Sequence, residues 1–149
     1  GGEGKSMTER DEVPPLGGVL ETGLYAEDLG RARHFYEAVL GLEPMYLDER
    51  LVAYPAGPGS VLLLFRRGAA TEPAILPGGM IPPHDAMGRI HFAFSIAPAD
   101  LDAWVARLAR HGIATEGGVS WPKGGQSVYF RDPDGNLVEL ATPGLWKNY

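Results

Sequence analysis

An internal repeat restricts the fold of this chain more than any other feature of its sequence. A strand pattern, an amphipathic helix that ends at a glycine and three more strand patterns occur in about residues 18–68 and again in about residues 89–143. The two helices end at Gly41 and Gly112, which hold matching positions. If each module curls its sheet with the helix over the aliphatic face, the opposite faces line a concavity. The sequence therefore predicts an α+β fold of tandem βαβββ repeats, each a curved mixed sheet with a helix on its outer face, forming a half-barrel cavity.

The elements of each copy follow from the spacing of apolar residues and from turn residues. In the first copy, Asp28 is placed to cap a helix whose apolar residues recur at helical spacing until Gly41. In the second copy, Pro98 starts the helix and Gly112 ends it. The predicted strands are residues 19–26, 45–47, 51–54 and 60–65 in the first copy, and residues 89–96, 113–119, 126–131 and 136–141 in the second.

The length of the chain favours a single domain. A chain of 149 residues can bury one sizeable core and is short for two independent domains. Residues 1–15 are expected to be a tag remnant followed by a flexible leader, so that residues 16–149 form the domain. The two modules are predicted to be joined by a loop rich in proline and glycine, residues 69–88, which is long enough to serve as a lid or a linker.

The charge and apolar patterns exclude several classes of partner. The formal net charge is −6 and the largest basic cluster is the pair Arg66 and Arg67, so neither nucleic acid nor an anionic membrane surface is an expected partner. No apolar run approaches the roughly 18 residues that a membrane helix needs. The absence of cysteine excludes disulfides and thiolate zinc sites and is compatible with the cytoplasm. We therefore expect a cytoplasmic protein that binds neither nucleic acid nor a membrane surface.

The segment 128–143 has the pattern of two strands joined by a tight turn. Pro133 sets φ for the first corner, Asp134 can bond its own backbone and Gly135 accepts a positive φ. Glu139 lies in the middle of the second strand, with apolar and small residues as its neighbours on the same face. A carboxylate at such a position is costly to bury unless it is paired, hydrogen-bonded or bound to a metal, so Glu139 requires a partner.

Two further polar residues, which the repeat relates to each other, are predicted to line the same cavity as Glu139. Glu21 lies near the start of the first strand of the first copy, and His91 matches it in the second copy. One imidazole and two carboxylates suit a divalent first-row metal such as Mn, Fe, Co, Ni or Zn, with positions left for water and substrate. Two carboxylates that meet without a cation would force one of them to keep a proton. We therefore predict that Glu21, His91 and Glu139 are metal ligands; the alternative is a satisfied core histidine and a Glu21 that reaches solvent.

These features resemble the vicinal oxygen chelate superfamily, which includes glyoxalase I, extradiol dioxygenases, methylmalonyl-CoA epimerase, fosfomycin-resistance enzymes and bleomycin-resistance binding proteins. The resemblance spans residues 18–145 and rests on the segments AEDLGRARHFYEAVLGL, IHFAF and YFRDPDGNLVEL. It implies a glyoxalase-like cavity, a homodimer, and ligands at the positions of Glu21, His91 and Glu139. In metal-using members the metal chelates substrate oxygens and stabilises an enolate or oxyanion, which makes Glu139 a candidate catalytic residue as well.

Departures from the family patterns leave the reaction open. Members of the glyoxalase I type use a fourth ligand, a glutamate, at the position nearest to Leu63, and extradiol dioxygenases have a histidine in place of Glu21. The resemblance implies a metal-dependent enzyme that acts on a small oxygenated organic substrate by lyase, isomerase or dioxygenase chemistry. The alternative is a metal-free protein that binds a drug or a metabolite in the same cavity, as bleomycin-resistance proteins do.

Further residues are expected to complete the site. His84 lies in the connecting loop, where a base could close over the substrate, so it is a second candidate catalytic residue. The alternative for His84 is an exposed loop histidine, and for the other residues it is core packing or a solvated surface charge. The candidate substrate-binding residues are Tyr25, Phe65, Arg66, Trp121 and Tyr129.

Overall fold

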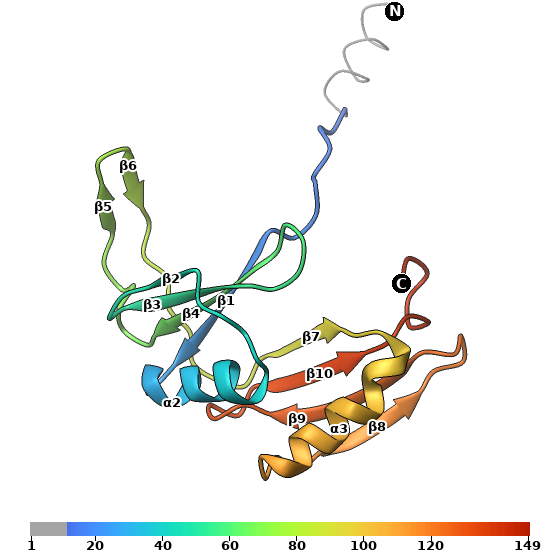
Figure 1. Ribbon diagram of the computed structural model, residues 1–149. Helices are drawn as coiled ribbons and strands as arrows, with labels where there is room; N and C mark the ends of the chain where they lie inside the picture. Colours follow the sequence, from blue (N-terminus) through green and yellow to red (C-terminus); the bar gives the residue numbers. More distant parts are fainter. Residues whose placement is uncertain (1–11) are drawn as a thin grey trace, which may run out of the picture.

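A computed structural model describes residues 12–149 and contains two four-stranded sheets and a two-stranded hairpin (Figure 1). The first sheet has the order β1-β4-β3-β2, and the second has the order β7-β10-β9-β8. The strands of the first sheet are β1 (Glu21–Ala26), β2 (Tyr46–Leu47), β3 (Leu51–Pro55) and β4 (Val61–Arg66). Those of the second sheet are β7 (His91–Ser95), β8 (Gly117–Ser120), β9 (Gln126–Arg131) and β10 (Leu137–Ala141).

The two sheets share one topology and one register. β1 pairs in parallel with β4, and β7 pairs in parallel with β10, whereas the other pairs in both sheets are antiparallel. Gly23 lies opposite Leu63 in the first sheet, as Ala93 lies opposite Glu139 in the second. The predicted tandem βαβββ fold is confirmed, and the register places Leu63 at the repeat-related position of Glu139.

The helix of the first module packs against the aliphatic faces of both sheets. It consists of α2 (Leu29–His34), which is capped by the Asp28 side chain, and a π-helical segment η1 (Phe35–Val39). The rings of Phe35 and Phe130 lie 6.1 Å apart between centroids, which joins the helix to the second sheet. The shared core contains Leu24, Leu62 and Leu64 from the first sheet and Phe130, Val138 and Leu140 from the second.

The second module places its helix differently. A short 3-10 turn η2 (Pro98–Asp100) leads into α3 (Leu101–Arg110), of which Leu108 is the buried residue. The Arg107 guanidinium donates to the carbonyl oxygens of Val39 and Ala38 at 2.7 and 2.8 Å, which satisfies acceptors at the end of the first helix. This contact ties the two modules together.

The shared core determines where the polar faces point. Successive residues of a strand alternate between faces, so residues such as Glu21 and Glu139 lie on the sides turned away from that core. Both sheets remain open, and within one chain these faces line separate cavities. The sequence had left open whether the shared concavity is built within one chain or across a dimer.

Three segments differ from the sequence-based expectation. The predicted helix up to Gly41 is α-helical only to His34, after which the amide of Leu40 bonds to the carbonyl of Phe35, five residues back. β8 starts at Gly117 rather than at residue 113, because the Ile113 amide still bonds to Leu108 at the end of α3.

The third difference lies in the connection 69–88, which contains a hairpin of β5 (Ala74–Leu76) and β6 (Gly79–Ile81). This hairpin stands away from both sheets (Figure 1), and Ile75 and Met80 on one of its faces are exposed. Residues 12–20 have no regular structure and are exposed, whereas the predicted tag remnant and the first part of the predicted leader lie in residues 1–11, outside the described part of the chain. Between residues 12 and 149, no helix is long and apolar enough to cross a membrane.

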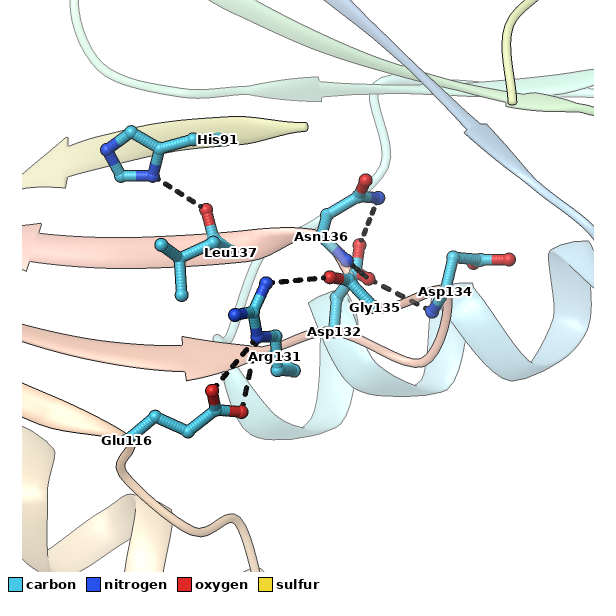
Figure 2. Close-up of polar contacts among 8 residues, drawn as sticks. All are labelled: His91, Glu116, Arg131, Asp132, Asp134, Gly135, Asn136 and Leu137. Atoms are coloured by element: carbon cyan, nitrogen blue, oxygen red, sulfur yellow. Dashed lines mark hydrogen bonds and ion pairs between the residues drawn. The ribbon is translucent and has the colours of Figure 1, made fainter. Parts of the chain in front are cut away.

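The turn between β9 and β10 is organised by Asp132, as Figure 2 shows. Its carboxylate accepts the backbone amides of Asp134 and Asn136 at 3.0 and 2.9 Å, and Gly135 adopts the predicted positive φ of 84°. The expectation that Asp134 bonds its own backbone is wrong, because its side chain instead accepts the amide of Glu27 in the first module at 2.9 Å. The motif therefore fixes both the turn and the contact between modules.

Candidate functional site

The structure brings two of the three predicted ligands together. His91 is the first residue of β7 and Glu139 is the middle residue of the adjacent strand β10. Their side chains lie on the same face, and Nε2 of His91 is 3.1 Å from Oε1 of Glu139. The Glu139 side chain is 8% exposed and that of His91 is 50% exposed, so a buried carboxylate lies beneath an imidazole that faces solvent.

The second ring nitrogen of His91 defines the chemistry of this pair. Nδ1 lies 3.0 Å from the carbonyl oxygen of Leu137 (Figure 2), and a carbonyl can only accept a hydrogen bond. Nδ1 therefore carries a proton, and a neutral His91 then directs the lone pair of Nε2 at Glu139. A lone pair and a carboxylate oxygen at 3.1 Å repel each other unless a proton or a cation lies between them.

A hydrogen-bond chain fixes the other oxygen of Glu139. The Ser127 hydroxyl donates to Oε2 at 2.5 Å, and the indole N–H of Trp121 donates to that hydroxyl at 2.8 Å. Ser127 is 2% exposed, so its hydrogen bond to Glu139 is shielded from water. Trp121, which we expected to contact substrate, thus supports Glu139 through Ser127.

Ser127 was not identified from the sequence, although a signal for it exists. In β9 it lies two residues from Tyr129, and the register places Tyr129 opposite Glu139 and Ser127 opposite Ala141. A small polar residue on the face that carries the carboxylate is therefore visible once the strands are paired. Tyr129 stands beside His91, with ring centroids 6.2 Å apart, and its pKa is raised by burial and then by the negative charge of Glu139.

The pair lies in a cavity of about 380 Å³. Besides His91 and Glu139, this cavity is bordered by the C-terminal segment, including Trp146 and Tyr149. The Tyr149 hydroxyl donates to the carbonyl of Ala141 at 2.7 Å and holds this segment against β10, whereas the Trp146 side chain is 70% exposed. An aromatic ring at the rim of the cavity was not anticipated from the sequence.

Glu21 lies in a second cavity, of about 390 Å³, in the first module. Phe65 and His84 also line it, and the Tyr25 hydroxyl is 2.5 Å from Nδ1 of His84. The Tyr25 and Phe65 rings are stacked with centroids 5.6 Å apart. Three residues predicted separately therefore form one cluster on the Glu21 side. Several other polar residues of this cavity were not identified from the sequence, namely Tyr46, Asp48, Arg50 and Glu72.

Arg66 does not reach either cavity. It alternates with Phe65 along β4, so its side chain lies on the opposite face, and its guanidinium donates to the carbonyl oxygen of Glu49 at 3.3 Å. Glu21 likewise does not join His91 and Glu139 within one chain. Among residues 12–149, no group of three or more histidine, cysteine, aspartate or glutamate side chains is placed to hold a metal ion.

Comparisons with family models, curated proteins and solved structures all relate this chain to the same superfamily. A family model described as the Glyoxalase/Bleomycin resistance protein/Dioxygenase superfamily matches residues 18–140. The crystal structure of a lactoylglutathione lyase from Agrobacterium tumefaciens is 39% identical, covers 90% of this chain and 99% of its own, and has a TM-score of 0.78. The metallothiol transferase FosB of Shouchella clausii (strain KSM-K16) is 29% identical over 87% of this chain and 83% of its own.

The fosfomycin resistance protein FosX from Mesorhizobium loti shares the fold. It has a TM-score of 0.60 and 23% identity, and the match covers 86% of this chain and 93% of that protein.

Proposed function

The chain belongs to the Glyoxalase/Bleomycin resistance protein/Dioxygenase superfamily, and from this premise we propose that it is a metal-dependent enzyme acting on a small oxygenated organic molecule. Of lyase, isomerase and dioxygenase chemistry, the lyase has the most support, because the 39% identical neighbour is named a lactoylglutathione lyase. Leu63 at the repeat-related position of Glu139 distinguishes this chain from the four-ligand glyoxalase I pattern, so its substrate need not be the same.

The orientation of His91 relative to Glu139 carries this proposal. A divalent cation removes the repulsion between Nε2 and Oε1 without requiring an extra proton on either group. Two atoms that held one ion at about 2.1 Å each would lie roughly 3.0 to 3.4 Å apart, a range that includes the observed 3.1 Å. Metal-bound histidines commonly donate their other N–H to a carbonyl, as Nδ1 of His91 does to Leu137. The residues present therefore fit a metal ion.

The third ligand in this proposal is Glu21 of the partner subunit. Within one chain, Glu21 and the His91–Glu139 pair lie on outward faces on either side of a shared core. A second copy that sets its first module on the open face of the second sheet would supply the missing carboxylate. All four residues of β8, at the edge of that sheet, are exposed, so a partner subunit can pack against them.

Each chain residue then has a defined role. His91, Glu139 and Glu21 of the partner subunit hold the ion, which when bound acts as a Lewis acid toward a substrate oxygen. Ser127 and Trp121 orient Glu139, while Tyr129 and Trp146 border the substrate. Tyr25, Phe65 and His84 enter the same active site together with Glu21.

Elemental analysis of protein purified without chelator tests this proposal. We expect about one Mn, Fe, Co, Ni or Zn ion per chain, and loss of the metal in His91→Ala and Glu139→Ala. Arg66→Ala is the matched control, because Arg66 lies away from both cavities. A wild-type protein that holds no metal and gains no thermal stability from any of these ions would overturn the proposal and favour the metal-free binding protein.

The reaction class can be tested with compounds named by the relatives. Lactoylglutathione should form from glutathione and the corresponding 2-oxoaldehyde with the metal-loaded enzyme if lyase chemistry is shared, because the thioester is the favoured side of that equilibrium, whereas fosfomycin with a thiol should react if the transferase chemistry is shared. Turnover that disappears in His91→Ala and in Glu139→Ala would assign the reaction to this site.

A further inference from the structure

We propose that Tyr25 is a positioning residue that locks His84 as its Nε2–H tautomer, and that this N–H donates to the substrate oxygen that gains negative charge. The inference rests on the proposed function and adds an electrophile to the same active site. It assigns to His84 the role of hydrogen-bond donor rather than the role of base expected from the sequence.

The first observation is the contact between the two side chains. The Tyr25 hydroxyl and Nδ1 of His84 are 2.5 Å apart, and no other hydrogen-bond partner of this hydroxyl is found within residues 12–149. If Nδ1 carried the proton and donated it, the phenol proton would have no acceptor in this part of the chain. Donation from the phenol to Nδ1 uses both groups, and it leaves the imidazole proton on Nε2.

The second observation is the environment that holds the pair. The Phe65 ring meets the His84 ring edge-on at 4.7 Å between centroids and stacks on Tyr25, so both rings are fixed by packing. The backbone amide of His84 donates to Ala70 at 2.8 Å, which anchors the connecting segment at this point. Burial, with the nearby Asp85 charge, raises the pKa of Tyr25, so the phenol keeps the proton that it donates.

The third observation is the location of His84. It lines the cavity that contains Glu21, and no partner of Nε2 is found among the described residues. In the proposed dimer, the cavity that supplies Glu21 also brings this N–H to the bound substrate. A neutral imidazole whose tautomer is fixed in advance polarises an oxygen without releasing its proton, and such preorganised donors stabilise developing negative charge.

Nuclear magnetic resonance of ¹⁵N-labelled protein tests the tautomer without any assay of activity. We expect the wild-type His84 spectrum to show Nε2 protonated and Nδ1 as an acceptor. In Tyr25→Phe, which keeps the ring stacking on Phe65, we expect a mixture of both tautomers. An unchanged His84 spectrum in Tyr25→Phe would overturn the positioning role, whether or not the protein proves to be a metal enzyme.

Kinetics of the metal-loaded dimer test the donor role. Losing one such donor typically costs about 100-fold or more in kcat, so His84→Ala should lower kcat by roughly that factor with unchanged metal content and little change in KM. His84→Gln keeps an amide N–H near the Nε2 position and should recover part of the loss, and Tyr25→Phe should lower kcat less than His84→Ala does. His34→Ala is the control, since His34 lies at the end of α2.

Each kinetic outcome has a distinct meaning. An active wild type whose kcat is unaffected by His84→Ala would overturn the donor role and leave the proposed function standing. Loss of metal in His84→Ala would also overturn it, because His84 would then belong to the metal site.

Discussion

At the residue scale, the function depends on how a few polar atoms are oriented. His91 bonds the Leu137 carbonyl through Nδ1, and Glu139 accepts the Ser127 hydroxyl through Oε2. Nε2 of His91 and Oε1 of Glu139 therefore face each other. Ser127 and Glu139 are buried and the bond from Trp121 to Ser127 is partly buried, which makes these hydrogen bonds costly to break.

The Ser127 hydroxyl can be tested directly. In Ser127→Ala, Oε2 of Glu139 and the Trp121 indole both lose a buried partner, so we expect metal affinity to fall about 10- to 100-fold. Competition with a chelator measures this affinity, and a change in Trp121 fluorescence reports the lost indole contact. Ser120→Ala, in the exposed strand β8, is the control and should leave both readouts unchanged. Unaltered metal affinity in Ser127→Ala would show that Glu139 does not require this support.

Tyr36 gives a prediction about pH. Its hydroxyl donates to buried Asp132 at 2.6 Å, and burial, followed by the Asp132 charge, raises the Tyr36 pKa well above its usual value near 10. The folded state therefore holds the phenol proton more tightly than the unfolded state. This stability is fully present below about pH 10 and is lost as the pH rises toward the folded pKa.

We therefore expect the free energy of unfolding to fall above about pH 10, and to fall less steeply in Tyr36→Phe. At neutral pH this variant should be less stable by roughly 1–3 kcal/mol, because Asp132 loses a buried donor. Urea unfolding at several pH values measures both effects. An equally steep loss in wild type and variant would show that other groups cause the alkaline transition.

At the element scale, the first helix and α3 together set how the modules pack. The first helix continues as the π-helical segment η1, and Arg107 from α3 binds two carbonyl oxygens at its end. The wider π-turn was not predictable from apolar spacing, because that spacing fits one face of an α-helix as well. The hairpin β5–β6 was missed because the run of prolines and glycines around it is more typical of a loop.

Arg107 offers an element-scale test. Arg107→Ala removes two charge-assisted hydrogen bonds to the backbone of the other module, so we expect a loss of roughly 1.5–3 kcal/mol in unfolding free energy. For a chain of this size, that loss lowers the melting temperature by roughly 3–12 °C. Arg110→Ala, on the exposed end of the same helix, is the matched control. Calorimetry that shows equal melting temperatures for both variants would mean that Arg107 contributes nothing to the module contact.

At the scale of the whole molecule, the arrangement of two sheets around one core separates the predicted ligands. Glu21 and the His91–Glu139 pair lie in different cavities of one chain, and the proposed site requires a partner to bring them together. Mixing inactive variants tests this arrangement, because a composite site takes its residues from different subunits.

Glu21→Ala and His91→Ala should each be inactive, and their mixed dimer should contain one intact site. With free exchange of subunits, half of the dimers are mixed, so we expect about a quarter of wild-type activity. A mixture of His91→Ala and Glu139→Ala is the control and should stay inactive, because both residues come from the same half of the site. If native mass spectrometry shows mixed dimers but the first mixture gains no activity, the sites are not shared between subunits.

The sequence by itself determined the repeat, the order of helix and strands within each module and the candidates Glu21, His91 and Glu139. These follow from local patterns, because strand alternation and turn residues fix which side chains share a face. The sequence also predicted that His91 and Glu139 lie on cavity-lining faces, and the structure brings the two together because β7 and β10 are neighbours.

Only the tertiary structure decided which faces meet. The aliphatic faces of both sheets pack around the first helix, since burying them together removes the most apolar surface from water. That packing turns the two polar faces outward, and it leaves Arg66 outside both cavities while Tyr25, Phe65 and His84 form one cluster. Such packing depends on the sum of many weak contacts between residues far apart in the sequence, and local residue patterns do not specify these contacts.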